Sequence, residues 1–453
     1  MLASTLRQRR HNLKQKIDFP AILWSGGARS RNFPNTYPFR ASSHFLYFAG
    51  LPLENAAIRL DDGKLELYWD EPPEESTLWH GEQSDRDEIA AQIGADAAYP
   101  LPELSDRPRD AATIAVQDAT TYQQQINTLN RSLSSPHESE GRDLTLIKAI
   151  ICLRLTHDRH ALSELQKAAN VSVEAHQAGM RKAKIAKTEA EVRGAMESAI
   201  IANNMTCSYN SIVTVRGEVL HNERYDNPVE AGDLILADVG AETPLGWAAD
   251  ITRTFPATGK FSPTQRDIYD VVLAAQKRCI DRVKPGVEYR DIHLLAALTI
   301  AEGLVDLGIL RGTPSELVDR DAHALFFPHG IGHLLGLDVH DMEDLGDLAG
   351  YEAGRQRSDR FGLGYLRLDR TLRSQMLVTI EPGFYQVPAL LQRAQKQDKY
   401  KKIVNWERLA KFADTRGIRI EDDVLVTESG CEILTEKLPK VAEHIEELVM
   451  GNG

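Results

Sequence analysis

Residues 234–255 read LILADVGAETPLGWAADITRTF, and this stretch decides the fold expected for the C-terminal part of the chain. Two largely apolar runs flank the segment GAETPLG, in which Pro244 and Gly246 should turn the chain. The pattern predicts a hairpin whose two strands present Asp238 and Asp250 side by side. Aspartate is unfavourable inside a strand and costly to bury unpaired, so we expect a partner that compensates the two carboxylates. A pair of turn or capping aspartates is the alternative interpretation.

Two strand-like runs further along the chain each hold a glutamate among β-branched residues. LVTIEPGFY contains Glu381 and IRIEDDVLVT contains Glu421, so we expect both glutamates inside strands. A buried glutamate raises the same question of compensation as the two aspartates. For Glu421 the alternative is local pairing with Arg419 or Asp422.

A histidine cluster completes the set of candidate ligands. Residues 329–341 read HGIGHLLGLDVHD and contain His329, His333 and His340, with ordinary core histidines as the alternative interpretation. Two aspartates, two glutamates and such a cluster are difficult to bury in one core without a cation. Carboxylate oxygens with one imidazole suit a pair of divalent ions, and Mn²⁺ is the leading candidate.

The composition limits the remaining classes of function. The 453 residues are 42% hydrophobic and 26% charged and carry a net charge of −13, which argues against nucleic-acid and membrane-surface roles. No apolar run approaches the roughly 18–20 residues that cross a bilayer. The N-terminal sequence MLASTLRQRRHNLKQK lacks the apolar core of a secretory signal. We expect a cytoplasmic protein whose scattered cysteines are reduced thiols: Cys152, Cys207, Cys279 and Cys431.

The pattern of the chain changes near residue 160, and the length suits two domains. We expect a smaller α/β domain at residues 1–160 and an α+β domain at residues 161–453. Helical periodicity runs from about Asp143 to Asn204. Strands are expected in the first domain at residues 21–26 (AILWSG), 44–50 (HFLYFAG) and 64–69 (KLELYW). Helices are expected in the second domain at residues 264–283 and, as a basic amphipathic helix, at residues 395–412.

Taken together, these motifs resemble those of a known family. The segments ILADVG, AADITRTFP, HGIGHLLGLDVHD, TIEPGFY and IRIEDDVLVT resemble the proline-specific dinuclear metallopeptidases of the pita-bread fold, a group that contains Xaa-Pro dipeptidases (prolidases) and aminopeptidase P. The resemblance covers roughly residues 165–445, and TYPFRASSHFLYFAGL more weakly resembles the family's N-terminal domain. It implies a pita-bread catalytic domain that hydrolyses the Xaa-Pro bond.

The resemblance also implies a role for each candidate ligand. Carried over position by position, it makes Asp238, Asp250, His333, Glu381 and Glu421 the metal ligands, with Asp250 and Glu421 bridging two ions. The same ligands accept Co²⁺ and Zn²⁺ as alternatives to Mn²⁺. The interval from Asp238 to Asp250 is twelve positions where the family usually has eleven, and we expect the additional residue to enlarge the turn at ETPLG.

The remaining histidines are expected near the substrate. By the same resemblance, His329 and His340 stabilise the oxyanion and orient the carbonyl, and His221 of VLHNERYDNP is a third substrate-site histidine. Glu381 is the expected proton shuttle. The alternative for each histidine is a satisfied core imidazole.

Two residues are expected to orient the ligating carboxylates. Tyr209 and Thr252 are the candidates, because their hydroxyl groups could bond to the ligating carboxylates. For both, an ordinary strand residue is the alternative.

The choice between the two subfamilies depends on Arg367, which precedes Glu381 by fourteen residues. This position resembles that of the prolidase arginine that binds the free carboxylate of the dipeptide. Arg370 is the alternative residue for that task. The forty-residue interval from Glu381 to Glu421 also resembles prolidase. We therefore expect an Xaa-Pro dipeptidase that is a homodimer by resemblance. The alternatives are aminopeptidase P, in which Arg367 would be a surface charge, a metal-free binding protein of the same fold, and a creatinase-like enzyme.

Overall fold

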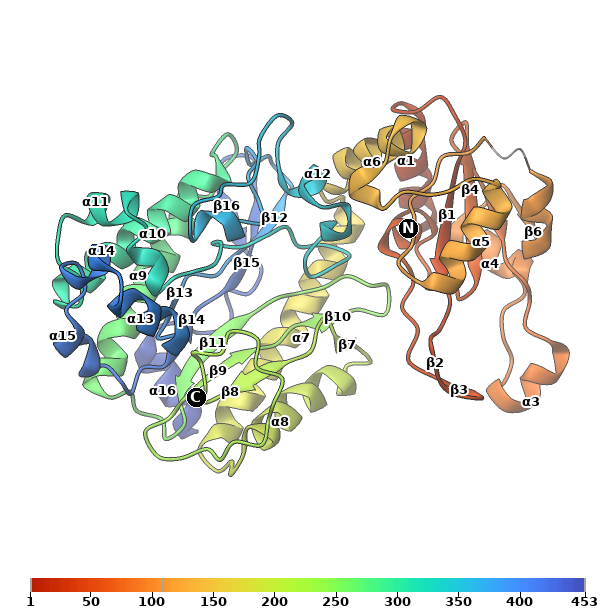
Figure 1. Cartoon of the computed structure of the whole chain (residues 1–453). Coiled ribbons are helices and arrows are strands. Elements are labelled where there is room, and N and C mark those ends of the chain that lie inside the picture. Colours follow the sequence, from red (N-terminus) through yellow and green to blue (C-terminus); the bar gives the residue numbers. More distant parts are fainter. Residues whose placement is uncertain (1, 108–109, 452–453) are drawn as a thin grey trace. The chain divides into compact units, whose positions relative to one another are not determined.

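The computed structural model describes residues 2–107 and 110–451, which form two compact units. The first unit comprises Met1–Leu162, Pro244–Gly246 and Met342–Ala349, and the second comprises Ser163–Thr243, Trp247–Asp341 and Gly350–Gly453 (Figure 1). Helices and sheets occur in both, in agreement with the expected α/β and α+β classes. No helix among the described residues has the length and apolar character needed to span a membrane.

The first unit is built on a four-stranded sheet in the order β1-β4-β5-β6. Its strands are β1 (Ala21–Gly26), β4 (Ala56–Asp61), β5 (Lys64–Tyr68) and β6 (Ala97–Tyr99). The β1–β4 and β4–β5 pairs are antiparallel, and β6 runs parallel to β5. The longer helices of this unit are α1 (Leu2–Lys14), α4 (Arg86–Ile93), α5 (Ala119–Leu129) and α6 (Gly141–Arg154). The strands predicted at residues 21–26 and 64–69 are confirmed.

The strand predicted at residues 44–50 is wrong, because this segment forms helix α2 (Ser43–Ala49). All seven residues of α2 are buried, Ser43 and His44 among them, so the run has no exposed polar face from which a helical period could be read. Gly50 ends the helix in the left-handed conformation, with φ of 72°, and its N–H donates to the carbonyl of Leu46.

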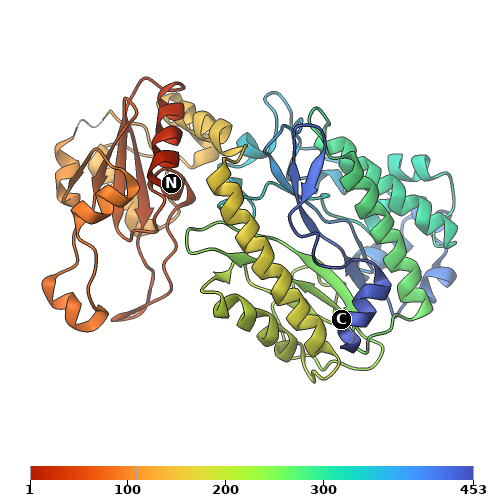
Figure 2. The ribbon, with the colours of Figure 1, turned by 180° about the vertical axis from the view of Figure 1, so that it is seen from behind.

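Helices surround small sheets in the second unit. They include α7 (Arg159–Ala183), α8 (Glu189–Ala202), α9 (Pro263–Arg282), α10 (Tyr289–Asp306) and α16 (Ala442–Met450). Figure 2 shows α7 running along the back of this unit. It contacts the segment that follows β9 through His176 and Ser172, which bond to the backbone of Val239 and Ala241. The helix predicted at residues 264–283 is confirmed as α9, and a capping box of Ser262 and Gln265 begins it.

The predicted hairpin at residues 234–255 is confirmed. Strand β9 (Leu234–Asp238) pairs antiparallel with β11 (Thr252–Pro256), and Asp238 lies opposite Thr252. Strand β8 (Ile212–Thr214) pairs with the other edge of β9. The short β10 (Ala241–Glu242) leaves this hairpin to pair with β7 (Thr206–Cys207). Asp238 therefore ends one strand, while Asp250 lies two residues before the other begins.

The expectation that the two glutamates lie inside strands is wrong in an informative way. Glu381 lies between β12 (Leu377–Ile380) and β13 (Gly383–Tyr385), and Glu421 lies between β14 (Gly417–Arg419) and β15 (Asp422–Val426). Strand β12 pairs with β15, which also pairs with β16 (Cys431–Ile433), whereas β13 pairs with β14 in a separate sheet. Each glutamate therefore occupies the break at which the chain passes from one sheet to the other.

The single basic helix predicted at residues 395–412 is also wrong. The chain forms three short helices instead, which are α13 (Pro388–Gln395), α14 (Asp398–Lys401) and α15 (Trp406–Ala410). Between α14 and α15, Ile403 and Val404 are buried. The Ile403 carbonyl accepts from the N–H of Arg311, and Val404 forms a β-bridge with Leu310. Pairing with a distant segment therefore overrides the local helical pattern.

Candidate metal centre and substrate pocket

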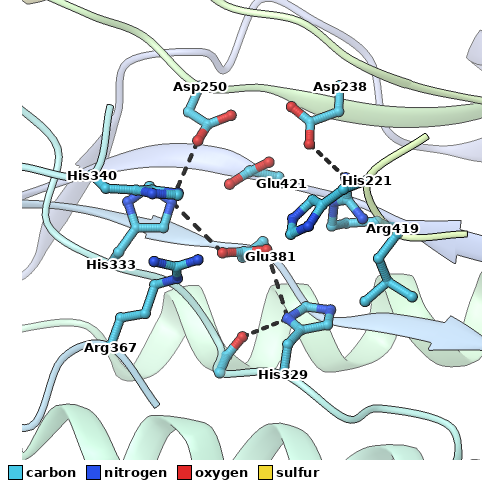
Figure 3. Close-up of a pocket in the computed structure, with 12 residues that line it drawn as sticks. His221, Asp238, Asp250, His329, His333, His340, Arg367, Glu381, Arg419 and Glu421 are labelled. Atoms are coloured by element: carbon cyan, nitrogen blue, oxygen red, sulfur yellow. Dashed lines mark hydrogen bonds and ion pairs between the residues drawn. The ribbon is translucent and has the colours of Figure 1, made fainter. Parts of the chain in front are cut away.

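One pocket of the second unit brings together the nine side chains expected to act on metal or substrate. It has a volume of about 110 Å³ (Figure 3). The expected residues that line it are His221, Asp238, Asp250, His329, His333, His340, Arg367, Glu381 and Glu421, and they are joined by Leu220, Gly330 and Arg419. Arg367 thus lies in the pocket lining. The sequence analysis expected this position in a dipeptidase, and a surface position in aminopeptidase P.

The two aspartates of the hairpin share one hydroxyl group. The Oη atom of Tyr209 lies 2.5 Å from Oδ1 of Asp238 and 2.6 Å from Oδ1 of Asp250. A phenol has one proton, so at any moment it can donate to one of these carboxylates but not to both. Burial and the surrounding carboxylates raise the pKa of Tyr209 well above its usual value, which keeps that proton in place. Tyr209 therefore orients both aspartates, as the sequence predicts, but does not neutralise them.

Thr252 and Arg419 hold Glu421 and give Asp238 a second partner. The Thr252 hydroxyl donates to Oε2 of Glu421 at 2.7 Å and accepts from Nε of Arg419 at 2.9 Å. Arg419 also donates through Nη2 to Oδ2 of Asp238 at 2.5 Å. The arginine expected as a partner of Glu421 thus makes its direct ion pair with Asp238 and reaches Glu421 through the threonine. This bridge links the two halves of the ligand set.

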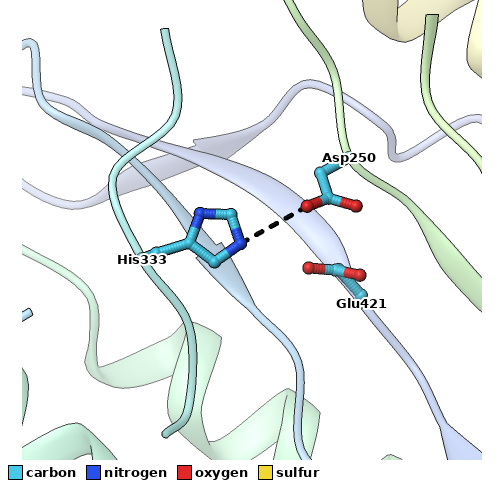
Figure 4. Close-up of side chains that lie close together, drawn as sticks. All are labelled: Asp250, His333 and Glu421. Atoms are coloured by element: carbon cyan, nitrogen blue, oxygen red, sulfur yellow. Dashed lines mark ion pairs between the residues drawn. The ribbon is translucent and has the colours of Figure 1, made fainter. Parts of the chain in front are cut away.

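His333 has the tautomer that a metal ligand needs. Its Nδ1 atom lies 3.0 Å from the Leu334 carbonyl, which can only accept, so Nδ1 carries the proton. Nε2 faces the carboxylates, 3.3 Å from Oδ2 of Asp250 and 3.7 Å from Oε1 of Glu381; it donates to Asp250 when the ring is protonated and offers a lone pair to a cation when the ring is neutral. Donor atoms of Asp250, His333 and Glu421 all lie within 4.8 Å of one another (Figure 4).

The protonation behaviour of the carboxylates fits a cation. Burial raises the pKa of Asp238 to about 6 and that of Glu381 to about 7, in spite of opposing contributions from Arg419 and, for Glu381, His333. Burial and the neighbouring carboxylates raise the pKa of Glu421 well above its usual value. For Asp250, burial acts to raise the pKa, but the hydrogen bond and charge of His333, the hydrogen bond from Tyr209 and the charge of His340 together lower it. Protein cations alone therefore do not balance this cluster, and an oxygen-rich set with one imidazole suits divalent metal ions.

His329 lies in the pocket with both ring nitrogens in contact with protein atoms. Nδ1 is 2.7 Å from the carbonyl of Gly330, and Nε2 is 2.9 Å from the hydroxyl of Tyr385. Nδ1 therefore carries the proton and Nε2 accepts from Tyr385, whose oxygen in turn accepts from Arg419 at 2.9 Å. Burial, followed by the charge of Arg419, lowers the pKa of His329 to about 3 and keeps the ring neutral.

The other substrate-site candidates line the same pocket. The ring of His340 lies edge-to-face against His333, with centroids 4.4 Å apart. His221 is exposed at the pocket, and burial of its inner part, with the charges of Arg419 and Arg367, lowers its pKa. The alternative interpretation of a core imidazole therefore does not describe His221. Arg370, the other candidate for a substrate carboxylate, is buried outside the pocket lining.

Sequence reasoning missed the role of Tyr385 and gave Arg419 an incomplete one. Tyr385 is the second residue after the motif TIEPG and is fully buried in β13. Arg419 precedes Glu421 by two residues, a spacing that places both side chains on one face in extended chain. That alternation is the signal from which an arginine directed into the pocket could have been inferred.

Models of known protein families match both parts of the chain. The model for metallopeptidase family M24 matches residues 163–428, and the model for the N-terminal domain of aminopeptidase P matches residues 6–118. The first match includes all the pocket residues described above. It identifies the second unit with a family of metal-dependent peptidases.

Relatives that align with most or all of the chain are named as aminopeptidases. A protein of Phaeosphaeria nodorum named Probable Xaa-Pro aminopeptidase is 33% identical over 91% of this chain and 87% of its own length. The solved structure of Pseudomonas aeruginosa aminopeptidase PepP covers 100% of this chain and 99% of its own, with 29% identity and a TM-score of 0.82. Escherichia coli aminopeptidase P bound to the inhibitor Pro-Leu covers the same shares, with 26% identity and a TM-score of 0.79.

Proposed function

The chain belongs to metallopeptidase family M24, and we propose that it removes the N-terminal residue from peptides whose second residue is proline. The observation that carries this proposal is the convergence of four carboxylates and one imidazole from distant segments on one buried pocket. A binding protein of the same fold has no need to bury such a set. The proposal therefore keeps the Xaa-Pro metallopeptidase activity that the sequence analysis expects.

Metal chemistry suits the bond in question. The nitrogen of proline has no hydrogen in a peptide, so an enzyme cannot grip this bond by its N–H. Divalent cations held by Asp238, Asp250, His333, Glu381 and Glu421 would supply an activated water and polarise the carbonyl next to proline. The chain's own residues must then move the proton and stabilise the developing charge.

We assign those tasks to three residues. Glu381, whose pKa burial raises to about 7, takes a proton from water and passes it to the departing proline nitrogen. His340 and His221 face the pocket from irregular segments and are placed to donate to the substrate carbonyl. The nitrogens of His329 are in contact with Gly330 and Tyr385, so its part is to orient Tyr385 and Arg419.

The names of the relatives favour aminopeptidase over dipeptidase, which reverses the weighting drawn from the sequence. Pro-Leu, the inhibitor bound to the Escherichia coli relative, is what remains when the first residue leaves an Xaa-Pro-Leu peptide. A dipeptidase remains the second candidate because Arg367 lines the pocket, where its guanidinium could bind the free carboxylate of an Xaa-Pro dipeptide.

A paired assay with Mn²⁺ tests this choice. Hydrolysis of Ala-Pro-Ala and of Ala-Pro is measured for the native protein and for Arg367→Ala. Cleavage of the tripeptide that survives Arg367→Ala supports the aminopeptidase. Cleavage of the dipeptide alone, lost in Arg367→Ala, supports the dipeptidase. If neither peptide is cleaved although metal is bound, the peptidase proposal fails.

For the metal we propose a pair of Mn²⁺ ions. The proposal is supported by the donor set, in which four ligands are carboxylates and one is an imidazole. Elemental analysis of protein prepared without added metal, followed by reconstitution with Mn²⁺, Co²⁺ or Zn²⁺, measures both stoichiometry and activity. Two equivalents with the highest activity in Mn²⁺ are expected, and preferential activity with Zn²⁺ would contradict the choice.

We further propose a cytoplasmic homodimer. Three large apolar side chains of the first unit are strongly exposed, which are Phe33 (95%), Leu78 (79%) and Trp79 (77%). Exposed apolar groups of this size are typical of association surfaces. The four cysteines are free, as in a reducing compartment. Light scattering should give twice the chain mass, and Trp79→Ser should shift the equilibrium towards monomer, with exposed Ile185→Ser in the second unit as the control.

A further inference from the structure

Arg253 is fully buried, and the protein satisfies every hydrogen-bond donor of its guanidinium. Nε donates to the carbonyl of Pro439 at 3.0 Å. Nη1 donates to the carbonyls of Glu421 at 2.6 Å and Thr252 at 3.1 Å. Nη2 donates to Oδ1 of Asp422 at 2.7 Å and to the carbonyl of Leu438 at 3.1 Å. A guanidinium has five N–H groups, and all five are used.

Asp422, the charged partner of Arg253, is equally well satisfied. Its Oδ1 atom accepts from Arg253 and from the hydroxyl of Thr435, and its Oδ2 atom accepts from Gln276 of α9 and from Nζ of Lys440. Both Arg253 and Asp422 are 0% exposed. Burial alone would raise the pKa of Asp422, but Arg253 and Lys440 hold it down to about 2. The carboxylate is thus charged and fixed from four directions.

This pair lies directly behind Glu421, the ligand that occupies the break between β14 and β15. The N–H of Glu421 donates to the Thr252 carbonyl at 3.0 Å, and its carboxylate accepts from the Thr252 hydroxyl. Its carbonyl accepts from Arg253. The guanidinium therefore supplies at the sheet-to-sheet break the donor that a neighbouring strand supplies inside a ladder.

A buried ion pair needs an explanation other than stability. Taking both charges out of water costs about as much as their attraction returns, and apolar residues of similar size often serve equally well. Here the fork geometry of arginine does what no apolar residue can, because it clamps two backbone carbonyls of facing segments, Thr252 and Glu421, with one planar group.

From these contacts we propose that Arg253 and Asp422 form a positioning pair that sets the orientation of Glu421 and thereby the metal affinity of the site. The inference rests on the proposed function, because it assumes that Glu421 is a metal ligand. Neither residue of the pair lines the pocket, so neither touches substrate. Their effect passes through the backbone of Glu421, with Lys440 as a charged support of Asp422.

The test compares metal binding in four variants of the full chain. Arg253→Lys keeps the charge but loses the fork. The double variant Arg253→Met with Asp422→Asn removes both charges of the pair, so neither member is left as an unpaired buried charge, and Lys440, whose side chain is 17% exposed, is the group that loses its partner. Lys440→Met removes only the charged support. Arg278→Met is the matched control, because Arg278 pairs with Glu302 on the surface at 2.6 Å.

Mn²⁺ affinity is measured by calorimetry, spin coupling between bound Mn²⁺ ions by electron paramagnetic resonance, and folding by circular dichroism. Loss of outer partners of metal ligands costs about 10–100-fold in affinity, and we expect that loss for Arg253→Lys and for the double variant. Lys440→Met should lose less, and Arg278→Met should match the native protein. The coupled Mn²⁺ signal should weaken in step with affinity.

Three results would overturn the inference. The first is Mn²⁺ affinity within twofold of the native value in folded Arg253→Lys and in the folded double variant. The second is a double variant that has both the Mn²⁺ affinity and the thermal stability of the native protein, because the pair would then contribute to packing only. The third is a native protein that binds no metal, which would sink the proposed function and this inference with it, whereas the first two leave the proposed function standing.

Discussion

The two walls of the pocket differ in what holds their side chains. The metal wall consists of Asp238, Asp250, His333, Glu381 and Glu421, and the substrate wall consists of His221, His340 and Arg367. Each residue of the metal wall lies in a strand, within two residues of one, or on a segment hydrogen-bonded to one. Each residue of the substrate wall lies on a bend, a turn or irregular chain.

The difference teaches where the precision of the site comes from. Metal ligands must keep fixed mutual distances, and strands with outer hydrogen bonds provide that rigidity. Groups that touch a peptide must accept different side chains, which loops on a rigid scaffold allow. Removing a metal-wall residue should therefore abolish binding of the ions, whereas removing a substrate-wall residue should alter catalysis with the ions in place.

The largest effect is expected from Glu421→Gln, which keeps the shape of a bridging ligand but removes its charge. Mn²⁺ affinity should fall by more than the roughly 10–100-fold that loss of an outer partner costs, and peptidase activity should vanish with it. Calorimetry with Mn²⁺ gives the affinity, with Glu436→Gln as a control outside the pocket lining. Near-native Mn²⁺ affinity in folded Glu421→Gln would contradict the assignment of Glu421 to the metal wall.

A smaller effect is expected from His340→Ala, in the substrate wall. If His340 donates to the developing oxyanion, kcat should fall by about 10²–10³-fold while the Mn²⁺ content stays at its native value. Steady-state kinetics with Ala-Pro-Ala, together with elemental analysis, separates the two quantities. Loss of metal from folded His340→Ala would move this histidine to the other wall.

Tyr209→Phe should lower the Mn²⁺ affinity of the metal wall, but by less than Glu421→Gln does. The variant removes the hydroxyl that contacts Asp238 and Asp250 but leaves both ligands present. A decrease of about 10–100-fold in Mn²⁺ affinity is expected, with less change in thermal stability. Tyr122→Phe, whose hydroxyl bonds only to the Leu133 carbonyl in the first unit, is the matched control. Equal affinities in the two variants would show that the aspartates need no orientation.

The smallest effect is a pH shift within the substrate wall. Burial, then the positive charges of Arg419 and Arg367, lowers the pKa of His221, while Glu223 opposes them. Arg367→Met removes one positive charge, so the pKa of His221 should rise and its protonation should begin at a higher pH on acidification. Nuclear magnetic resonance of ¹³C-labelled histidine, assigned with His221→Gln, measures it. An unchanged or lower pKa in Arg367→Met would contradict the expected proximity of the two groups.

The metal wall was also the wall that the sequence predicted better. Asp238 and Asp250 stand out because a hairpin pattern of local origin surrounds them, and the predicted hairpin forms, with Asp238 opposite Thr252. The placement of Glu381 and Glu421 inside strands failed because the passage between two sheets is a tertiary event that a short apolar run does not reveal. The helix at α2 was misread for a related reason, since a run buried on all sides has no period.

Contacts between distant segments escaped prediction altogether. Arg419 donates to Asp238 across 181 positions of the chain, and no local pattern distinguishes that partner from the adjacent Glu421. Arg253 drew no attention for the same reason, because a lone arginine in an apolar strand gives no sign of what it faces. The candidate metal ligands can be read from sequence, whereas the network that orients them cannot.

The break between sheets at Glu381 and Glu421 has a consequence for the folding of the second unit. A chain that has formed only the β9–β11 hairpin offers two of the five ligands. The two glutamates come together only after β12–β15 and β13–β14 have paired, and His333 is held by the N–H of Thr379 in β12. Because metal binds strongly only to the complete set, its binding free energy is added to the assembled tertiary structure and to no partial one. Bound metal thereby acts as an all-or-none reporter of correct assembly, and its release should accompany the first disengagement of the two sheets.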